Sequence, residues 1–580
     1  MRALGRPLPR LLLLIAGWTV IGWVVFGWRL GYPSFWDPDE ATYAETSREM
    51  LAAHNWLVPL YDGQPFFDKP PLFFMLQMAS FSAFGATELA ARLVSAVSAI
   101  ALLLVVGWFG SRLFNRDVGR NSALMLAVLH ATFALSSYAI VDMTFTLFLF
   151  GGCALVTVAA LGGEVRLKPD PTATTATRHL WGPPSGGPRT RLQYAGYVLL
   201  AAAVLTKGPL ALVLAGLAFL VSLAVAPAAR APLLRLRWGR GLLIILALSA
   251  PWFFYMWHRF GDAFVVGYAL KENLWLFSGS LYGSQRSMLF YPKVMLVGLL
   301  PWTPLLLGRL FDAVRGLRIS TPERLLWSWA VVVVGFFTVS GFKLDHYVFP
   351  AAPALCILCA HAWDSARTAE KHPVGIVIGL AVIPLLLVAA GIVLIPGLNR
   401  VPLELPAAAR LLPIALIASG IAMMAQVARR GRPAPIPYAA VAGLLASYAM
   451  VLTIGLPAFE QMKPTRRLAK IVATQATADD HVGMFRLNRW NSSWRFYVGR
   501  HSERLETADQ LRAFLARPGR HYCAMLRRDY DRLTAEGFRL RIVHQEPGLF
   551  TTTGRSLRSG APPGRDAFII VTEEPAAPGA

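Results

Sequence analysis

Hydrophobic residues in this chain occur in long uninterrupted runs, and short polar segments rich in arginine separate them. Examples are 11–30, 92–111, 195–227, 374–396 and 436–456. Runs of this length and apolarity cross a hydrocarbon core about 30 Å thick as α-helices. With 55% hydrophobic and only 15% charged residues, the composition is not that of a soluble globular protein. The pattern therefore predicts a polytopic α-helical membrane protein.

The basic residues between the runs predict the orientation of the chain. Lysine and arginine gather in cytoplasmic loops, and thirteen spans bring every basic cluster to that side, with the N-terminus inside and the C-terminus outside. The first span has no small-residue cleavage site behind it, so we expect a retained helix. The expected spans are 11–30, 92–111, 121–139, 142–163, 194–206, 209–227, 241–258, 289–311, 325–341, 346–363, 374–396, 409–427 and 436–456.

The short apolar segment 72–85 affects this topology. If it crossed the membrane, every later loop would change sides, so we expect an interfacial or half-buried helix there. The segments between spans that then fall on the outer face hold most of the unusual polar residues. They are 31–91, 140–141, 206–208, 259–288 and 342–345. We therefore expect several separate outer segments to build one site at the membrane surface.

Composition also divides the chain into domains. Residues 1–456 form the expected membrane domain, within which 164–193 is rich in proline, threonine and glycine and is expected to be a disordered cytoplasmic insertion. Residues 457–580 are more polar and predict a small α/β domain outside the membrane. Its expected strands are HVGMF, HYCAML, RLRIVH and AFIIVT, and its expected helix is TADQLRAFLA.

Charge and cysteines exclude two classes of function. The net charge of +23 comes from arginines between hydrophobic spans, where they set topology, so we expect membrane lipids and no nucleic acid as partners. Three of the four cysteines lie in apolar spans and the fourth stands alone in the tail. No disulfide framework is implied.

The stretch WDPDEATYAETSREM at 36–50 holds the first candidates for chemistry, Asp37, Asp39 and Glu40. A D-x-D pair suggests a site for a metal and a nucleotide sugar, but nucleotide sugars are cytoplasmic and this loop is expected outside. A carboxylate that acts as general base on a hydroxyl suits the position better. The alternative is that Asp39 only caps the helix that follows.

The candidate phosphate-binding cations are three lysines, Lys69, Lys207 and Lys343. Lys69, after Asp68 and before two prolines, has a stiffened backbone and a flexible charged tip suited to a phosphate. Snorkelling, or pairing with Asp68 or a lipid headgroup, explains it equally well. Lys207 lies between two apolar segments, where an unpaired lysine costs roughly 2.5–3.5 kcal/mol, so we expect a partner; a position at the membrane interface would lower that cost.

Further polar residues lie where spans begin. Asp142 is either a supporting carboxylate or a helix cap. In GFKLDHYVFP at 341–350, Lys343 and Tyr347 are four residues apart and would face one ligand if the segment were helical. His346 alone is weak support for a metal.

Taken together, these stretches resemble the polyprenyl-phosphate-dependent glycosyltransferases of the GT-C superfamily, which include the aminoarabinose transferases and relatives of the dolichyl-phosphate-mannose protein mannosyltransferases. The resemblance covers about the first 360 residues in family order. The matching segments are DEATYAETSREML at 39–51 with W-x-V-P at 56–59, G-x-P-F-F-D-K-P-P-L at 63–72, ELAARLVSA at 88–96, VDMTFT at 141–146, LTKGPLALVL at 205–214, APWF at 250–253, LLPW at 299–302 and KLDHYVFPAAPAL at 343–355.

The resemblance implies a thirteen-span fold and a lipid-linked sugar donor bound at the outer face. It makes Asp39 the best candidate base, with Glu40 beside it. Lys69, Lys207 and Tyr347 match positions that contact the donor phosphate. Asp68 matches an acidic position that takes part in metal binding.

One stretch departs from the family. Where aminoarabinose transferases carry a His-Glu-His-x-x-Arg-like run, this chain has KENLWL at 271–276. The missing histidines and arginine put a metal, and aminoarabinose transfer to lipid A in particular, in doubt. We therefore expect no certain cofactor and keep a divalent metal ion as an open alternative.

The leading hypothesis is an inverting glycosyltransferase of the bacterial inner membrane. It would move a sugar from undecaprenyl phosphate or a similar carrier to a hydroxyl or phosphate of a lipid A-like glycolipid, an envelope glycan or a protein. Protein O-mannosylation is the enzymatic alternative. A flippase or transporter of lipid-linked sugars is a rival of another class, but transporters tend to show related halves, and this sequence shows no internal repeat. A catalytically inactive scaffold is a third possibility.

Overall fold

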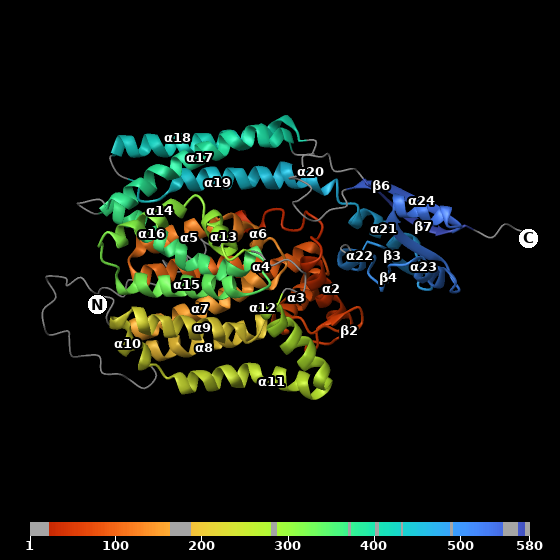
Figure 1. The fold of residues 1–580 in the computed structure, drawn as a ribbon, viewed down its shortest axis with the longest axis horizontal. Helices are drawn as coiled ribbons and strands as arrows, with labels where there is room; N and C mark the ends of the chain where they lie inside the picture. The colour runs from red at the N-terminus through yellow and green to blue at the C-terminus, as the bar shows by residue number, and fades with distance from the viewer. Residues whose placement is uncertain are drawn as a thin grey trace, which may run out of the picture.

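The computed structural model describes residues 22–162, 187–279, 287–368, 373–400, 405–430, 433–487, 491–548 and 566–574. Long helices lie side by side in a bundle, and a small sheet domain stands at one end of it (Figure 1). The first outer segment forms η1 (Trp23–Gly27), α2 (Asp39–Ala52), β1 (Leu60–Tyr61), β2 (Gln64–Pro65) and α3 (Leu72–Phe84).

The bundle follows in chain order. It consists of α4 (Glu88–Leu113), α5 (Arg116–Ala127), α6 (His130–Ser136), α7 (Val141–Leu161), α8 (Pro188–Lys207), α9 (Leu210–Val225), α10 (Pro227–Leu234), α11 (Trp238–Phe264), η3 (Val265–Trp275), α12 (Leu276–Ser278), α13 (Phe290–Gly298), α14 (Thr303–Val314), α15 (Thr321–Val339), η4 (Asp345–Ala351), α16 (Ala352–Thr368), α17 (Val374–Arg400), η5 (Ala407–Arg410), α18 (Leu411–Arg430), α19 (Tyr438–Met450), η6 (Val451–Gly455) and α20 (Leu456–Glu460).

The prediction of a polytopic helical membrane protein is confirmed. Within the described residues, seven helices are long and apolar enough to cross a membrane, or nine if the bent pairs α5–α6 and α13–α14 each count as one span. Each expected span from 92–111 onward falls on helices of the bundle, although 121–139 and 289–311 each fall on two helices, bent by 66° and 114°. Most of 11–30 lies outside the described residues. The figure of thirteen crossings stays a prediction.

Two expected segments can be compared in more detail. The 13 residues of α3 span about 20 Å. This length is too short to cross the membrane, which agrees with the expected interfacial or half-buried helix. Most of the expected disordered insertion at 164–193 lies outside the described residues. Its end differs from the expectation, because α8 already begins at Pro188, and proline is favoured in the first turn of a helix.

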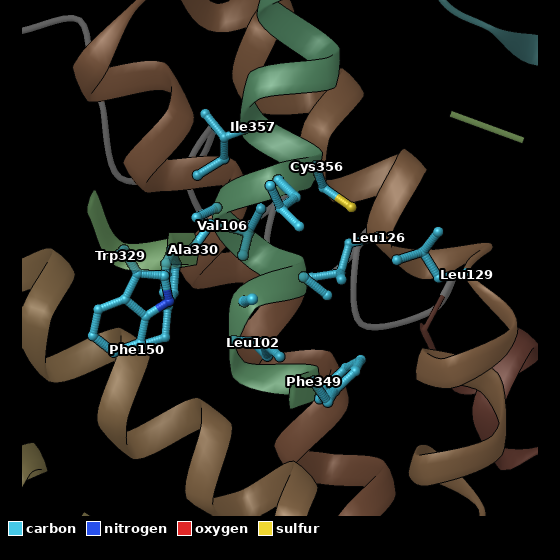
Figure 2. Packing of buried hydrophobic residues seen from close by; sticks show 14 of the residues in the cluster. Leu102, Val106, Leu126, Leu129, Phe150, Trp329, Ala330, Phe349, Cys356 and Ile357 are labelled. Carbon is cyan, nitrogen blue, oxygen red and sulfur yellow. The ribbon is translucent and has the colours of Figure 1, made fainter. Parts of the chain in front are cut away.

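The bundle core joins helices that are far apart in the sequence. Leu102 and Val106 of α4, Phe150 of α7, Trp329 of α15 and Cys356 of α16 belong to one buried cluster (Figure 2). In Figure 1, α17, α18 and α19 lie along one side of this core and α11 along the opposite side. Packing in this core fixes the positions of the helices relative to one another, and with them the helix ends that carry the polar residues.

Helices α7 and α8 approach each other at two glycines. A Cβ atom on Gly152 would lie 2.9 Å from the carbonyl oxygen of Gly196, and one on Gly196 would lie 2.9 Å from that of Gly152. Small residues at such a crossing let two helices in a membrane pack closely. This contact fixes the register of α7 against α8.

Helix α11 is interrupted before the segment that approaches the outer loop. Gly261 has a φ of 52°, which residues with a Cβ rarely adopt. On both sides of this break the chain packs against Phe67 of the first loop, whose ring contacts the ring of Phe260 before the break and that of Phe264 after it. The part of the chain after Gly261 therefore belongs with the outer segments.

The C-terminal domain is built on a five-stranded mixed sheet in the order β4-β3-β5-β7-β6. Separate apolar clusters pack on its two sides. All four expected strands and the expected helix are confirmed; the helix carries a capping box formed by Thr507 and Gln510. The elements are α21 (Thr465–Gln475), β3 (His481–Phe485), α22 (Asn491–Val498), β4 (Glu503–Leu505), α23 (Ala508–Leu515), β5 (His521–Leu526), α24 (Arg527–Ala535), β6 (Leu540–Gly548) and β7 (Asp566–Glu573).

A buried ion pair fixes the start of α2 against α4. The guanidinium of Arg92 donates to both carboxylate oxygens of Glu40 at 2.6 and 2.9 Å, and neither side chain is exposed. Arg92 also donates to the carbonyl oxygens of Leu30, Pro33 and Ser34. One arginine of α4 therefore ties residues 30–40 to the bundle.

We predict that Arg92→Ala strongly destabilises the protein. Removing one partner of a buried pair leaves an uncompensated charge and costs about 3–5 kcal/mol. The measurement is the midpoint of thermal unfolding in detergent. Arg512→Ala is the matched control, because Arg512 pairs with Asp509 at the surface, where such pairs contribute about 0–1 kcal/mol. Equal midpoints for the two variants would contradict the prediction.

Candidate active site

A cavity of about 280 Å³ lies where α2 and the loop after it meet the ends of α7 and α8. Segments expected on the outer face contribute to it together with these helix ends, so these separate segments do build one site. Its lining residues are Asp39, Tyr43, Phe66, Asp68, Lys69, Ile140, Val141, Asp142, Lys207, Glu272, Leu276, Phe342, Leu344, His346 and Tyr347.

Asp39 is the carboxylate in this cavity without a partner among the described residues. It is the first residue of α2, and the position before it is Pro38, so no side chain caps this helix end. The interpretation of Asp39 as a helix cap is therefore not supported. Asp39 is exposed at the edge of the cavity, and partial desolvation by the surrounding protein raises the pKa of its carboxyl.

Lys69 is held by its neighbour Asp68. Its ammonium donates to Asp68 Oδ1 at 2.5 Å and to the Asp68 carbonyl oxygen at 3.2 Å. The hydroxyl of Tyr43 donates to Asp68 Oδ2 at 3.1 Å. Glu272 Oε2 lies 3.9 Å from the Lys69 ammonium. Burial alone would raise the pKa of Asp68, but Lys69 and these hydrogen bonds lower it, so the carboxylate stays ionised and orients the lysine.

Asp142 and Lys207 meet because of the register between α7 and α8. They lie ten and eleven residues from the crossing glycines Gly152 and Gly196, which places both about 15 Å along antiparallel helices. The Lys207 ammonium donates to Asp142 Oδ1 at 2.5 Å, and both side chains are buried. Lys207 was expected to have a partner, and the structure shows that this partner is Asp142.

Two side chains from η4 complete this part of the cavity. His346 Nε2 lies 3.7 Å from Asp142 Oδ2. The ammonium of Lys207 lies 4.4 Å from the centre of the Tyr347 ring, a distance at which an aromatic face attracts a cation. Lys207 is therefore held on two sides while its remaining N–H groups can face the cavity.

Three predicted site residues do not line the cavity. Glu40 points into the bundle and pairs with Arg92. Asp37 accepts hydrogen bonds from the backbone N–H and the hydroxyl of Ser493. Lys343 is buried and donates to the carbonyl oxygen of Ser340. The expectation that Lys343 and Tyr347 share a helical face fails because the helix begins only at Asp345.

Sequence reasoning missed Tyr43 and Glu272 as cavity residues. A signal existed for each of them. Tyr43 lies four residues after Asp39 in the same helix and therefore on the same face. Glu272 is the one residue of KENLWL that keeps the acidic position of the family run, although the segment was noted only as a departure.

The cavity does not fit a metal ion. Among the described residues, no group of three or more His, Cys, Asp or Glu side chains could hold one. Of the two weak candidates, Asp68 has both oxygens engaged by Lys69 and Tyr43. His346 faces Asp142 and Asp345. No step of the chemistry below is assigned to a metal.

The C-terminal domain holds the loop that precedes α2. In addition to the Ser493–Asp37 contact, the ammonium of Lys463 donates to the carbonyl oxygens of Ser34 and Phe35 at 2.8 and 2.7 Å. The hydroxyl of Tyr497 accepts from the Phe35 N–H at 2.8 Å. The backbone around Asp39 is thus restrained by two sets of contacts. Arg92 of α4 holds Glu40, which follows Asp39, and the C-terminal domain holds the loop that precedes it.

Comparisons with known proteins agree with this arrangement. The family described as dolichyl-phosphate-mannose-protein mannosyltransferase matches residues 68–166. An undecaprenyl phosphate-alpha-4-amino-4-deoxy-L-arabinose arabinosyl transferase of Pectobacterium carotovorum subsp. carotovorum is 31% identical over 338 residues, covering 57% of this chain and 55% of that protein. The protein of the same name from Aeromonas salmonicida is 29% identical and covers 58% of each chain.

A solved structure agrees over nearly the whole chain. Structures of ArnT from Cupriavidus metallidurans superpose with TM-scores of 0.72, bound to undecaprenyl phosphate, and 0.68 in the apo state. The first is 21% identical and covers 96% of this chain and 97% of that one. The chain therefore has the fold of these two structures. It spans between 55% and 61% of the length of the curated relatives it matches.

The pKa of Asp37 predicts how stability depends on pH. Burial raises it from 3.8 to about 7, although the hydrogen bonds from Ser493 oppose the shift. The folded protein then binds more protons than the unfolded chain between these two pH values. This group's contribution to the free energy of unfolding therefore falls as the pH rises from 3.8 to 7 and is constant above that range.

The measurement is the thermal midpoint of wild type and Asp37→Asn at about pH 5 and about pH 8. Wild type should lose more stability between the two pH values than the variant does. Because other groups titrate in both proteins, the difference between them isolates Asp37. The same pH dependence in both proteins would show that the Asp37 carboxylate does not titrate in this way.

Proposed function

We propose that the protein transfers a sugar from a polyprenyl-phosphate carrier, of the undecaprenyl type, to an acceptor at the outer face of the bacterial inner membrane. The observation that carries the proposal is the cavity in which an unpartnered carboxylate, Asp39, faces two lysines, Lys69 and Lys207, whose positions are fixed by other carboxylates. A base and a pair of phosphate ligands are what such a transfer requires.

The lysines would bind the phosphate of the donor. An ammonium group has three N–H donors, and Lys207 uses one of them on Asp142. Lys69 uses two on Asp68. Because the carboxylates of the cavity outnumber its lysines, the phosphate binds through direct contacts with the ammonium groups and not through the net charge of the cavity. Tyr347 keeps the Lys207 ammonium beside the cavity.

Asp39 would act as the general base. In a single displacement, an acceptor oxygen forms a bond to the anomeric carbon, the bond between that carbon and the phosphate oxygen breaks, and the lipid phosphate leaves with the electron pair. The proton of the acceptor hydroxyl goes to Asp39. The anomeric centre is inverted. The raised pKa of Asp39 makes its carboxylate a stronger base, while the lysines stabilise the charge on the leaving phosphate.

Glu40 and Asp37 take positioning roles in this proposal, and Lys343 takes none. We keep the expected division into a membrane domain of 1–456 and an outer α/β domain of 457–580. The curated relatives are named as undecaprenyl phosphate-alpha-4-amino-4-deoxy-L-arabinose arabinosyl transferases, which supports the donor class; a glycolipid of the lipid A class is the first acceptor to test. The KENLWL segment lacks the histidines of the family run, so the identity of the transferred sugar is determined with the panel of donors described below.

We predict that Asp39→Asn lowers sugar transfer by about 10²–10⁴-fold and leaves donor binding unchanged, because Asp39 contributes the base and not the phosphate contacts. The assay supplies purified protein in lipid with a panel of labelled polyprenyl-phosphate sugars. Each sugar is paired with a lipid A-like glycolipid, a serine- and threonine-containing peptide, or no acceptor. Transfer to the peptide would assign protein glycosylation instead.

Asp262→Asn is the matched control, because Asp262 is an exposed carboxylate of the same outer region that does not line the cavity. It should retain wild-type transfer. Transfer by Asp39→Asn at the wild-type rate would remove the base assignment. If wild type released no sugar but moved the intact lipid across the bilayer, a flippase would replace the transferase.

A further inference from the structure

A second cavity, of about 460 Å³, lies between α7, α8, α9, α11 and α15. Its lining is almost entirely apolar and includes Phe150, Cys153, Tyr197 and Trp238. No residue lines both this cavity and the candidate active site. Cys153 lies eleven residues beyond Asp142 along α7, about 16 Å away. The second cavity therefore belongs to the other end of the bundle.

The cavity reaches the molecular surface between apolar helices. Leu242 lines it and is 53% exposed. Gly216 and Gly239 also line it and are exposed, and a Cβ atom on either would have no heavy atom within 4 Å. The opening thus lies between α9 and α11, and these two glycines leave its mouth free of side chains.

Two arginines lie at the end of this cavity that is farther from the candidate active site. Arg237 and Arg240 lie on either side of the lining residues Trp238 and Gly239, and both donate to the hydroxyl of Tyr194, at 3.2 and 3.3 Å. No acidic residue occurs between 194 and 261, so this segment does not neutralise them. Tryptophan and tyrosine are enriched at the level of lipid headgroups. The end of the cavity therefore combines a headgroup environment with positive charge.

We propose that this cavity binds one acyl chain of an anionic phospholipid from the leaflet at the arginine-rich end of the bundle. The chain enters between α9 and α11, and the headgroup phosphate is bound by Arg237 and Arg240. The occupant is anionic because Arg237 and Arg240 stand at the mouth and form no ion pair with an acidic residue in the described part of the chain. It is an acyl lipid because the interior offers apolar contacts. This site is independent of the sugar-transfer chemistry.

Native mass spectrometry of the purified full chain tests the proposal. Palmitoyl-oleoyl phosphatidylglycerol and the matching phosphatidylcholine are added in equal amounts. Wild type should retain one phosphatidylglycerol, preferred over phosphatidylcholine by roughly ten- to thirty-fold, since each basic residue near a lipid surface contributes about a fivefold preference. Gly216→Phe should lose the bound lipid, because its ring occupies the mouth of the cavity.

The double variant R237A/R240A should bind both lipids equally, whereas Arg235→Ala, which removes an exposed arginine of the same segment, should behave as wild type. This pair keeps the test decisive if Gly216→Phe fails to fold. Retention of phosphatidylglycerol by Gly216→Phe at the wild-type level would overturn the proposal. So would an unchanged preference in R237A/R240A, or retention of a polyprenyl lipid in place of the phospholipid.

Discussion

The Glu40–Arg92 ion pair is the constraint on which the candidate site depends. Successive residues of a helix point about 100° apart, so a Glu40 fixed inside the bundle directs Asp39 toward the cavity. Glu40 also accepts the backbone N–H groups of Trp36 and Ala139, which joins the start of α2 to the segment that leads into α7. A single carboxylate thus links the base to the helix that carries Asp142. Two adjacent acidic residues therefore have opposite roles, one inside the bundle and one in the cavity.

The remaining parts of the cavity are fixed by separate interactions. The close contact of Gly152 with Gly196 sets the height of Asp142 against Lys207. The neighbouring Asp68 orients Lys69. The C-terminal domain holds the loop before α2 through Lys463 and Ser493. Because each charged group already has its place, the protein need not rearrange to present them, which is the condition for effective electrostatic catalysis.

Much of this arrangement could be predicted from the sequence. Hydrophobic runs gave the helices, and arginine positions grouped the outer segments, so Asp39, Lys69, Asp142 and Lys207 could be expected in one place. The burial of Glu40 could not be predicted, because its partner Arg92 lies 52 residues away and nothing in the local sequence indicates a buried pair.

Other parts escaped prediction for the same kind of reason. Lys343 looked equivalent to Lys207 in the sequence, but its backbone is not helical, and it turns to the Ser340 carbonyl. Glu272 reaches the cavity only because the chain breaks at Gly261 and packs on Phe67. Periodicity predicts which residues share a face of one element, whereas contacts between distant elements depend on tertiary packing.

A cryo-EM structure of the protein in lipid with a bound polyprenyl-phosphate sugar would test the central claim most directly. The account predicts the phosphate within hydrogen-bonding distance of the ammonium groups of Lys69 and Lys207, and the anomeric carbon beside the Asp39 carboxylate. A phosphate bound at Lys343, or a sugar whose anomeric carbon lies out of reach of any acceptor that Asp39 could deprotonate, would contradict it.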